Sequence, residues 1–286
     1  MSHSNTALST VADYDSDLSP EITYRLATTH EELEAAFALV WDAYTEVGLH
    51  KSDDAGLRLT KYHLLPDTRV FIAIANVESR KAGKICTEEK VVGTVSIVHD
   101  GCLGLPSEEL SKDHIINLRQ DGGRLAEFIA LASNKKGTDN RVTMKLLRLA
   151  YEYCHQNGIT QIIASLAQHH IGFYRRFMGF KPLGKLSCYQ SANDTTAQVH
   201  ALCVRESFSL IEKRSTGLFS DYNWRLFWER QAEETLNLAK KMRPWDQKKI
   251  QYFSARHPFL LELIDIAAAG ALCKEYERLG CEFSIV

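Results

Sequence analysis

Hydrophobic and polar residues follow two different periods along the first two thirds of the chain. Short runs rich in β-branched and aromatic residues predict strands at residues 22–26, 70–76, 91–98, 124–133, 159–166, 180–183 and 197–204. Apolar residues three or four positions apart predict helices after Thr29, over Arg141–Gln156 and over His170–Met178. This alternation predicts an α/β (α+β) fold, in which a mixed central sheet carries helices on both faces.

Local signals mark the ends of these elements. Thr29 followed by Glu32 matches a capping box, in which each side chain accepts a hydrogen bond from the other residue's backbone. Gly158 and Gly179 follow the second and third predicted helices, where glycine can adopt the left-handed conformation that ends a helix. A polar, lysine-rich loop separates the second and third strands, a pattern typical of a hairpin.

Three parts are expected along the chain. Residues 1–20 are rich in Ser, Thr and Asp and are predicted to form a disordered tail. Residues 21–205 hold the predicted sheet, with an acidic and partly helical insertion at 106–118. Residues 206–286 show no strand pattern and are predicted to be a helical accessory region that packs on the first domain. Its helices are expected at residues 207–214, 222–242 and 257–279.

Composition narrows the class of protein. The 286 residues carry a formal net charge of -2, so no global positive field favours nucleic acid as a partner. The seven cysteines are scattered and form no C-x-x-C pair, which disfavours a disulfide framework or a zinc knuckle and favours a reducing cytosol. The first residues lack the basic and apolar parts of a signal peptide. Residues 259–273 are too short and too charged to span a bilayer. A cytoplasmic protein with no bound metal is therefore expected.

The segment ITQIIASLAQHHIGFYRRFMGFKPLG, residues 159–184, resembles the closing half of GNAT acyltransferases. In that superfamily a strand leads to a short helix that carries Phe-Tyr and then Gly-Phe, here Phe173-Tyr174 and Gly179-Phe180. The glycine lets the chain turn sharply from the helix into the next strand.

Three further tracts make the resemblance closer. Residues 53–74, 103–133 and 188–195 resemble the bacterial N-acyl amino acid synthases, including N-acyltyrosine synthases, as does the closing helix. That family is similar to the acyl-homoserine-lactone synthases. The resemblance implies a long-chain acyl donor on acyl carrier protein, with acyl-CoA as the alternative co-substrate, an amino acid as acceptor and no permanently bound cofactor.

The region after the central strand departs from the pattern of acetyl-CoA enzymes. Those enzymes use a glycine-rich loop whose backbone N–H groups cradle a diphosphate. Here residues 134–143 contain Gly137 alone, and Arg141 and Thr143 stand where the loop glycines are expected. Because acyl-phosphopantetheine on a carrier protein lacks the nucleotide diphosphate, this departure favours a carrier-protein donor. The donor-binding candidates are Ala130, Ala132, Lys136, Arg141, Val142 and Thr143.

Basic residues follow the same loop and admit two interpretations. They could meet an acidic carrier protein, or they could form an ordinary solvated helix face. The residues concerned are Lys135, Lys136, Arg141, Lys145 and Arg148.

Amide formation requires a base for the amine, donors for the oxyanion and an acid for the leaving thiolate. Glu127 is the candidate base, because a strand would place it on one face with Leu125, Ile129 and Leu131, where apolar surroundings raise a carboxyl pKa. The alternative for Glu127 is a salt bridge to Arg124 or Arg119.

Tyr174 is the candidate acid by its match to the GNAT helix, with a core aromatic as the alternative. Backbone N–H groups around Ala130–Ala132 are the candidate oxyanion donors. By resemblance the acceptor pocket lies near the first helix and its loop. Its candidate residues are Tyr44, Glu46, His63, Arg69 and Arg124.

Two other features remain open. Adjacent His169 and His170 do not predict a metal site, because neighbouring residues rarely converge on one ion. Lysines and an arginine surround Pro244-Trp245, which is compatible with peripheral membrane contact or with a solvated turn. The competing functions are an acyl-homoserine-lactone-type signal synthase, an acetyl-CoA N-acetyltransferase and a non-catalytic module that binds lipid or carrier protein. The sequence lacks a G-x-S-x-G elbow, a P-loop and a dinucleotide fingerprint.

Overall fold

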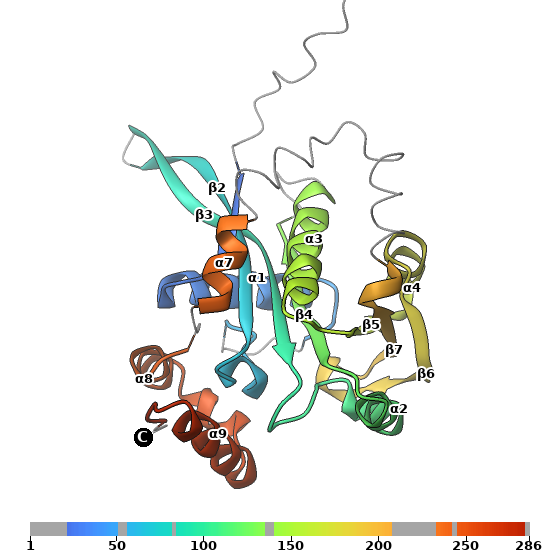
Figure 1. Cartoon of the computed structure of the whole chain (residues 1–286). Coiled ribbons are helices and arrows are strands. Elements are labelled where there is room, and N and C mark those ends of the chain that lie inside the picture. The colour runs from blue at the N-terminus through green and yellow to red at the C-terminus, as the bar shows by residue number, and fades with distance from the viewer. Residues whose placement is uncertain are drawn as a thin grey trace, which may run out of the picture.

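The computed structural model describes residues 22–50, 56–81, 84–134, 140–207, 233–241 and 245–283. A seven-stranded sheet with the order β1-β2-β3-β4-β5-β7-β6 forms its centre (Figure 1). The strands are β1 Ile22–Leu26, β2 Arg69–Lys81, β3 Lys84–His99, β4 Leu125–Ser133, β5 Gln161–Ala167, β6 Lys181–Tyr189 and β7 Thr195–Cys203. β4 and β5 pair in parallel and the other neighbours are antiparallel, which confirms the predicted mixed sheet.

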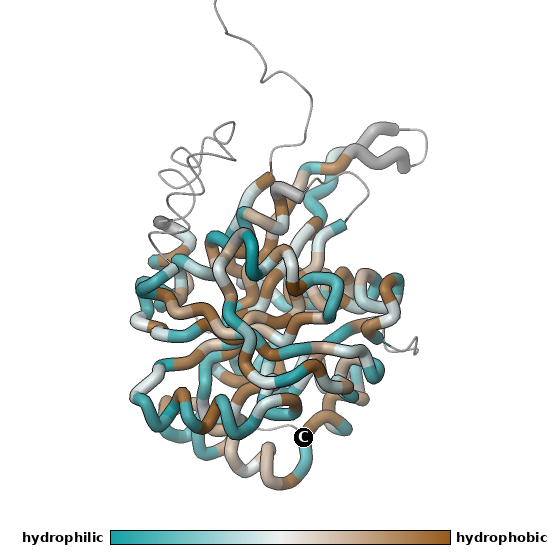
Figure 2. Tube along the Cα trace, turned by 90° about the vertical axis from the view of Figure 1, so that its right-hand side faces the viewer, coloured by the Kyte–Doolittle hydropathy of each residue, from teal (hydrophilic) through white to brown (hydrophobic). Residues whose placement is uncertain are grey.

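Helices cover both faces of the sheet. The longer ones are α1 His30–Glu46, α2 Glu108–Gln120, α3 Asn140–Gln156, α7 Glu233–Lys241, α8 Gln247–Arg256 and α9 Ile266–Arg278. The shorter ones are η1 Lys61–Leu64, η2 Gln168–His170, α4 Ile171–Phe173, η3 Tyr174–Met178, η4 Gln190–Ala192 and η6 Pro258–Leu263. Hydrophobic residues concentrate between these layers and polar residues lie outside them (Figure 2).

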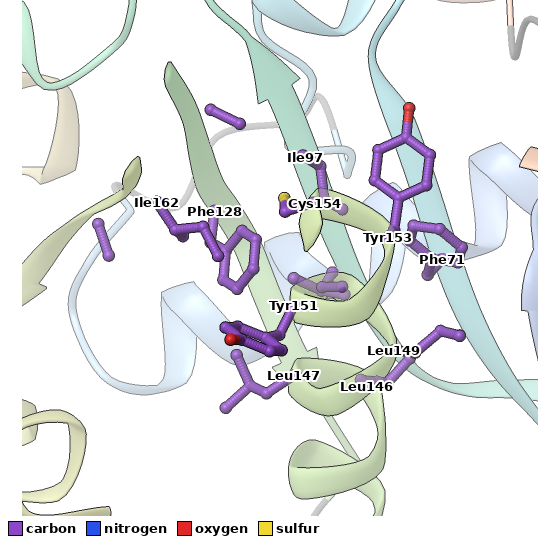
Figure 3. Packing of buried hydrophobic residues seen from close by; sticks show 14 of the residues in the cluster. Phe71, Ile97, Phe128, Leu146, Leu147, Leu149, Tyr151, Tyr153, Cys154 and Ile162 are labelled. Carbon is purple, nitrogen blue, oxygen red and sulfur yellow. The ribbon is translucent and has the colours of Figure 1, made fainter. Parts of the chain in front are cut away.

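Each face of the sheet has its own core. On one face, α3 packs against side chains that include Phe71, Phe128 and Ile162. Figure 3 shows Tyr151 and other α3 residues directed toward this face of the sheet. On the other face, α1, η1, α8 and α9 share a core with alternate residues of the same strands. The alternation follows from the two-residue period of a strand.

The predicted helix signals are confirmed. Thr29 Oγ1 accepts the Glu32 N–H at 3.2 Å, and Glu32 Oε2 accepts the Thr29 N–H at 3.3 Å, which completes the capping box. Gly158 has φ 68° after α3, and Gly179 has φ 84° after η3. Both glycines therefore occupy the left-handed region that ends a helix.

Several predicted boundaries are wrong. β2 continues to Lys81 and β3 already begins at Lys84, so most of the expected lysine-rich loop is strand. β6 runs to Tyr189 rather than ending at Leu183. Cross-strand pairing extends these polar segments, and the hydrophobic pattern alone does not reveal such pairing.

The C-terminal helices also differ from the prediction. The single helix expected over 257–279 is a 3₁₀ segment followed by α9, because Asp265 caps α9 by accepting the Ala268 N–H at 2.7 Å. α8 was not predicted, and Asp246 begins it by accepting the Lys249 N–H at 2.9 Å. The predicted helix at 207–214 and most of that at 222–242 lie outside the described residues, as does the 1–20 tail.

Trp245 belongs to the core and not to a solvated turn. Its ring is buried, stacks on Phe37 with centroids 6.5 Å apart and lies 5.1 Å from Phe253. Tyr276 of α9 donates from its hydroxyl to the Leu64 carbonyl at 2.9 Å. Of the C-terminal helices, α8 and α9 are thus held with α1 by one shared core.

Cysteine and metal chemistry are limited in the described residues. Six described cysteines are free thiols, and no cluster of three metal-ligating side chains occurs among the described residues. None of the described helices has the length and apolar character needed to cross a membrane.

Candidate active site

The parallel pairing of β4 and β5 ends at Glu127. Only Leu125, Ala126 and Glu127 of β4 have register partners in β5, although β4 continues to Ser133 and β5 to Ala167. Glu127, opposite Ile163, is the last residue of β4 that pairs with β5. The two strands therefore separate immediately beyond its carboxylate.

A β-bulge follows three residues later. Ala130 has φ 52°, and β3 shifts register between Ser96, opposite Ile129, and Thr94, opposite Ala132. A non-glycine residue in this region costs about 1–3 kcal/mol. The bulge reverses the side-chain direction, so Ile129 packs in the α1-face core and Leu131 against the α3-face core. The expectation that Leu131 shares the face of Glu127 is therefore wrong.

Glu127 is buried, with 1% of its surface exposed. Its Oε2 accepts the Ser107 backbone N–H at 2.8 Å, and its Oε1 accepts the Ser165 hydroxyl at 3.2 Å. Burial raises the pKa of Glu127 to about 7, and the hydrogen bonds from the two serines only partly oppose this rise. A carboxyl with this pKa is suited to proton transfer near neutral pH.

The arginines named as salt-bridge partners for Glu127 lie elsewhere. Arg119 pairs with Asp100 at 2.6 Å and with Glu108. Arg124 is exposed at the start of β4. In the part of the chain that the structure describes, Glu127 has no ion pair, so this alternative is wrong.

Tyr174 begins the π-helical segment that follows β5. Its carbonyl accepts the N–H groups of Gly179 and Phe180, and its ring meets Phe180 edge-on with centroids 5.6 Å apart. Burial raises the pKa of Tyr174, and the nearby Tyr44 raises it further. The phenol therefore stays protonated and can act as a hydrogen-bond donor.

Tyr44 connects α1 to the bulge. It packs against the cluster formed by Val40, Ala130 and Ala132. Burial raises the pKa of Tyr44, while Arg58 and a hydrogen bond with the Leu131 backbone oppose the rise. Tyr44 therefore contacts the bulge directly and is close enough to Tyr174 to affect its pKa.

The other acceptor candidates occupy different surroundings. Glu46 is exposed near the end of α1. His63 is buried, its Nδ1 accepts the Thr60 N–H at 3.1 Å, and burial lowers its pKa to about 3. Arg69 is buried and donates to the Ala239 carbonyl at 2.7 Å. The structure places none of these residues, nor Arg124, in contact with Glu127.

The donor-binding candidates are only partly described. Ala130 and Ala132 form the bulge, and Thr143 Oγ1 lies 2.9 Å from Ser133 Oγ. Val142 is buried against Gly93, where an added Cβ would come within 2.7 Å of the valine Cγ1. Lys136 and the Arg141 side chain lie outside the described residues.

Several site residues were missed from the sequence. Ser107 and Ser165 donate hydrogen bonds to the Glu127 carboxylate. Tyr62 and Tyr189 interact electrostatically with the same carboxylate. Burial and the charge of Glu127 raise the pKa of Tyr62 to about 12, and both effects also raise that of Tyr189. Tyr62, Ser107 and Tyr189 fall within the tracts 53–74, 103–133 and 188–195, and Ser165 within 159–184, so the resemblance of these tracts was the available signal.

Three features define a GNAT-type acyltransferase. They are a mixed sheet whose parallel strands β4 and β5 separate, the bulge at Ala130 and the short helical segment that begins at Tyr174. A structure of FeeM, an N-acyl amino acid synthase from uncultured soil microbes, is similar over 66% of this chain and 95% of that chain, with 23% identity and a TM-score of 0.56. The model of the N-acyl amino acid synthase FeeM family matches residues 35–202, and the chain belongs to that family. It is therefore an enzyme that transfers an acyl group to an amine.

More distant structures share the fold less closely. BjaI, a CoA-dependent acyl-homoserine lactone synthase, aligns over 68% of this chain and 89% of its own, with 17% identity and a TM-score of 0.46. An acyl-CoA N-acyltransferase from Pseudomonas aeruginosa aligns over 65% of this chain and 100% of its own, with 13% identity and a TM-score of 0.39. No curated protein sequence matches the chain significantly.

Proposed function

We propose that this enzyme transfers a long-chain fatty acyl group from acyl carrier protein to the α-amine of an amino acid. The observation that carries the proposal is the buried carboxylate of Glu127, with a pKa near 7, at the last paired position before β4 and β5 separate. The family's own name supports an amino acid as the acceptor.

Glu127 acts as the base in this proposal. The amino acid arrives as an ammonium ion, and the carboxylate removes a proton so that the nitrogen lone pair can attack the thioester carbon. A C–N bond forms, the carbonyl becomes an oxyanion, and the C–S bond then breaks as the carbonyl is restored. The attacking nitrogen, which carries a positive charge after the C–N bond forms, then releases a second proton to solvent and becomes the neutral amide nitrogen.

The bulge and Tyr174 serve the other two requirements. Backbone N–H groups of Ala130–Ala132 lie where β4 has left β5, and an irregular strand can turn such groups toward an oxyanion. Tyr174, held protonated by burial, donates its proton to the departing thiolate and recovers one from solvent. Its electrostatic interaction with Tyr44, which packs against the bulge, supports this role.

The sequence supports a carrier-protein donor over CoA, because the loop before α3 carries one glycine where a diphosphate cradle needs more. Two basic α3 residues proposed for carrier docking already contact aromatic rings. Lys145 Nζ lies 5.3 Å from the Tyr24 ring and Arg148 Cζ lies 5.9 Å from the Tyr151 ring. Such contacts hold the long side chains in place on the surface of α3.

We also propose that residues 21–205 form the catalytic unit and residues 206–286 an accessory unit. The burial of Trp245 and Tyr276 in the α1-face core supports a role for the second unit in holding α1, which carries Tyr44. A cytoplasmic enzyme that touches membranes through basic residues agrees with the exposed Lys240, Lys241 and Lys248. The buried Trp245 supplies no anchor for such contact.

Mass spectrometry of reaction mixtures tests the function. Purified enzyme is incubated with a pool of amino acids and either palmitoyl acyl carrier protein or palmitoyl-CoA. We expect an N-palmitoyl amino acid, formed faster with the carrier protein. A product formed only when S-adenosylmethionine replaces the amino acids as acceptor, or only when acetyl-CoA replaces the palmitoyl donor, would instead identify a lactone-type synthase or an acetyltransferase.

A further inference from the structure

Arg58 lies beside the candidate active site and was not singled out by the sequence. Its backbone N–H donates to the Phe37 carbonyl at 3.1 Å, which ties residue 58 to α1. One guanidinium nitrogen lies 3.0 Å from His50 Nδ1, and another donates to the Ser191 carbonyl at 2.9 Å. Its Cζ lies 5.1 Å from the centroid of the Tyr44 ring. Tyr44 of α1, His50 just after α1 and Ser191 of η4 therefore fix this guanidinium.

The positive charge of Arg58 is not neutralised by a neighbouring acid. None of the described carboxylates forms an ion pair with it. Its hydrogen-bond partners are an imidazole nitrogen and a backbone carbonyl. A guanidinium has five N–H donors, so these two contacts leave donors for an anionic ligand.

The charges of Arg58 and Glu127 act on the same residue. Glu127 raises the pKa of Tyr189, and Arg58 lowers it. Arg58 also lowers the pKa of Tyr44, against the effect of burial. Glu127 raises the pKa of Tyr62, in the same direction as burial. Tyr189 thus lies within reach of an anion and a cation. A cation at Arg58 and an anion at Glu127, both acting on Tyr189, are complementary to a small molecule that carries a carboxylate and an ammonium.

We propose that Arg58 binds the α-carboxylate of the acceptor amino acid while Glu127 faces its α-amine. This inference rests on the proposed function and names how the acceptor class is recognised. A fixed planar guanidinium binds a carboxylate by two parallel hydrogen bonds, and the same bonds set the direction of the amine. An amine without a carboxylate gains nothing from Arg58.

Ser191, whose carbonyl accepts a hydrogen bond from Arg58, is itself bound by α2. The Ser191 N–H donates to Glu109 Oε1 at 3.1 Å, and the Ser191 hydroxyl donates to the other oxygen of Glu109. Glu109 lies in α2, two residues after Ser107, whose N–H binds Glu127. The carboxylate and amine positions are therefore connected through one short segment of α2, which fixes their separation.

Matched acceptors test the proposal. Steady-state KM and kcat are measured with saturating palmitoyl acyl carrier protein for tyrosine and tyramine, and for phenylalanine and phenethylamine. The variants are Arg58→Met, which removes the charge, and Arg58→Lys, which retains it. Arg278→Met, on the exposed side of α9, is the control for losing an arginine elsewhere. Circular dichroism melts verify that each variant is folded.

Wild type should prefer each amino acid over its amine. Arg58→Met should raise KM for the amino acids by about 10–100-fold and leave both constants for the amines within about threefold, as expected for loss of a charged hydrogen bond. Arg58→Lys should recover part of the loss. Equal losses on amino acids and amines, or no preference in wild type, would overturn the role of Arg58 alone. Wild type that acylates no amino acid would overturn the proposed function.

Discussion

The backbone N–H of Ser107 donates to the Glu127 carboxylate across 2.8 Å, joining the start of α2 to the central strand of the sheet. Ser107 precedes a helix whose N-terminal end carries partial positive charge, which favours an anion at that place. Burial has the opposite effect and dominates, so the pKa of Glu127 is raised to about 7 rather than lowered. The same carboxylate is thus held in position and kept basic enough to accept a proton.

The raised pKa of Glu127 predicts a pH dependence of stability. The folded state favours the protonated carboxyl, so the stabilisation is complete below pH 4.5 and is lost as pH rises toward 7. Glu127→Gln resembles the protonated form at every pH. At pH 8 it should unfold with a free energy higher than that of wild type by on the order of 3 kcal/mol, and at pH 4 the difference should vanish. Urea titrations at both pH values measure this, and a gap that does not change with pH would contradict it.

The strained backbone at Ala130 predicts an unusual tolerance for glycine. Because φ is 52°, Ala130→Gly relieves strain that offsets the lost methyl group, and the free energy of unfolding should change by less than about 1 kcal/mol. Ala126→Gly, in an ordinary part of β4, should cost about 1–2 kcal/mol. Urea unfolding of the two variants makes the comparison. Equal costs would mean that the bulge is absent.

Trp245 predicts that the C-terminal region is needed for stability. Trp245→Ala removes a buried indole between Phe37 and Phe253 and should lower the free energy of unfolding by about 3–5 kcal/mol. Ile266→Ala, at a position with 94% exposure, is the control and should change it by less than about 0.5 kcal/mol. Thermal and urea unfolding report both values. A loss at Trp245 as small as that at Ile266 would show that the shared core contributes little.

Local patterns were enough to predict the sheet and its main helices. Thr29 and Glu32 began α1 as expected, and Gly158 ended α3, because capping depends on residues a few positions apart. The base candidate Glu127 also followed from a local pattern, namely a carboxylate within an apolar strand. The closing helix at Tyr174 followed from its family resemblance.

Contacts between distant residues escaped prediction. Arg58 and Ser191 are 133 positions apart, and no periodicity indicates that they meet. The bulge at Ala130 has no sequence signal, since alanine seldom adopts a positive φ and glycine is the usual marker. Trp245 was misjudged because its basic neighbours suggested a surface, whereas the indole packs inward between α1 and α8.

The pH dependence of kcat/KM for amide formation tests the role of Glu127 most directly. Wild type should gain about tenfold per pH unit below pH 7 and bend near pH 7, because the base must be unprotonated. Glu127→Gln should lower kcat/KM by about 10²–10⁴-fold and lose that bend, while remaining folded. A Glu127→Gln enzyme that keeps wild-type kcat/KM and the same bend would contradict the assignment of Glu127 as the base.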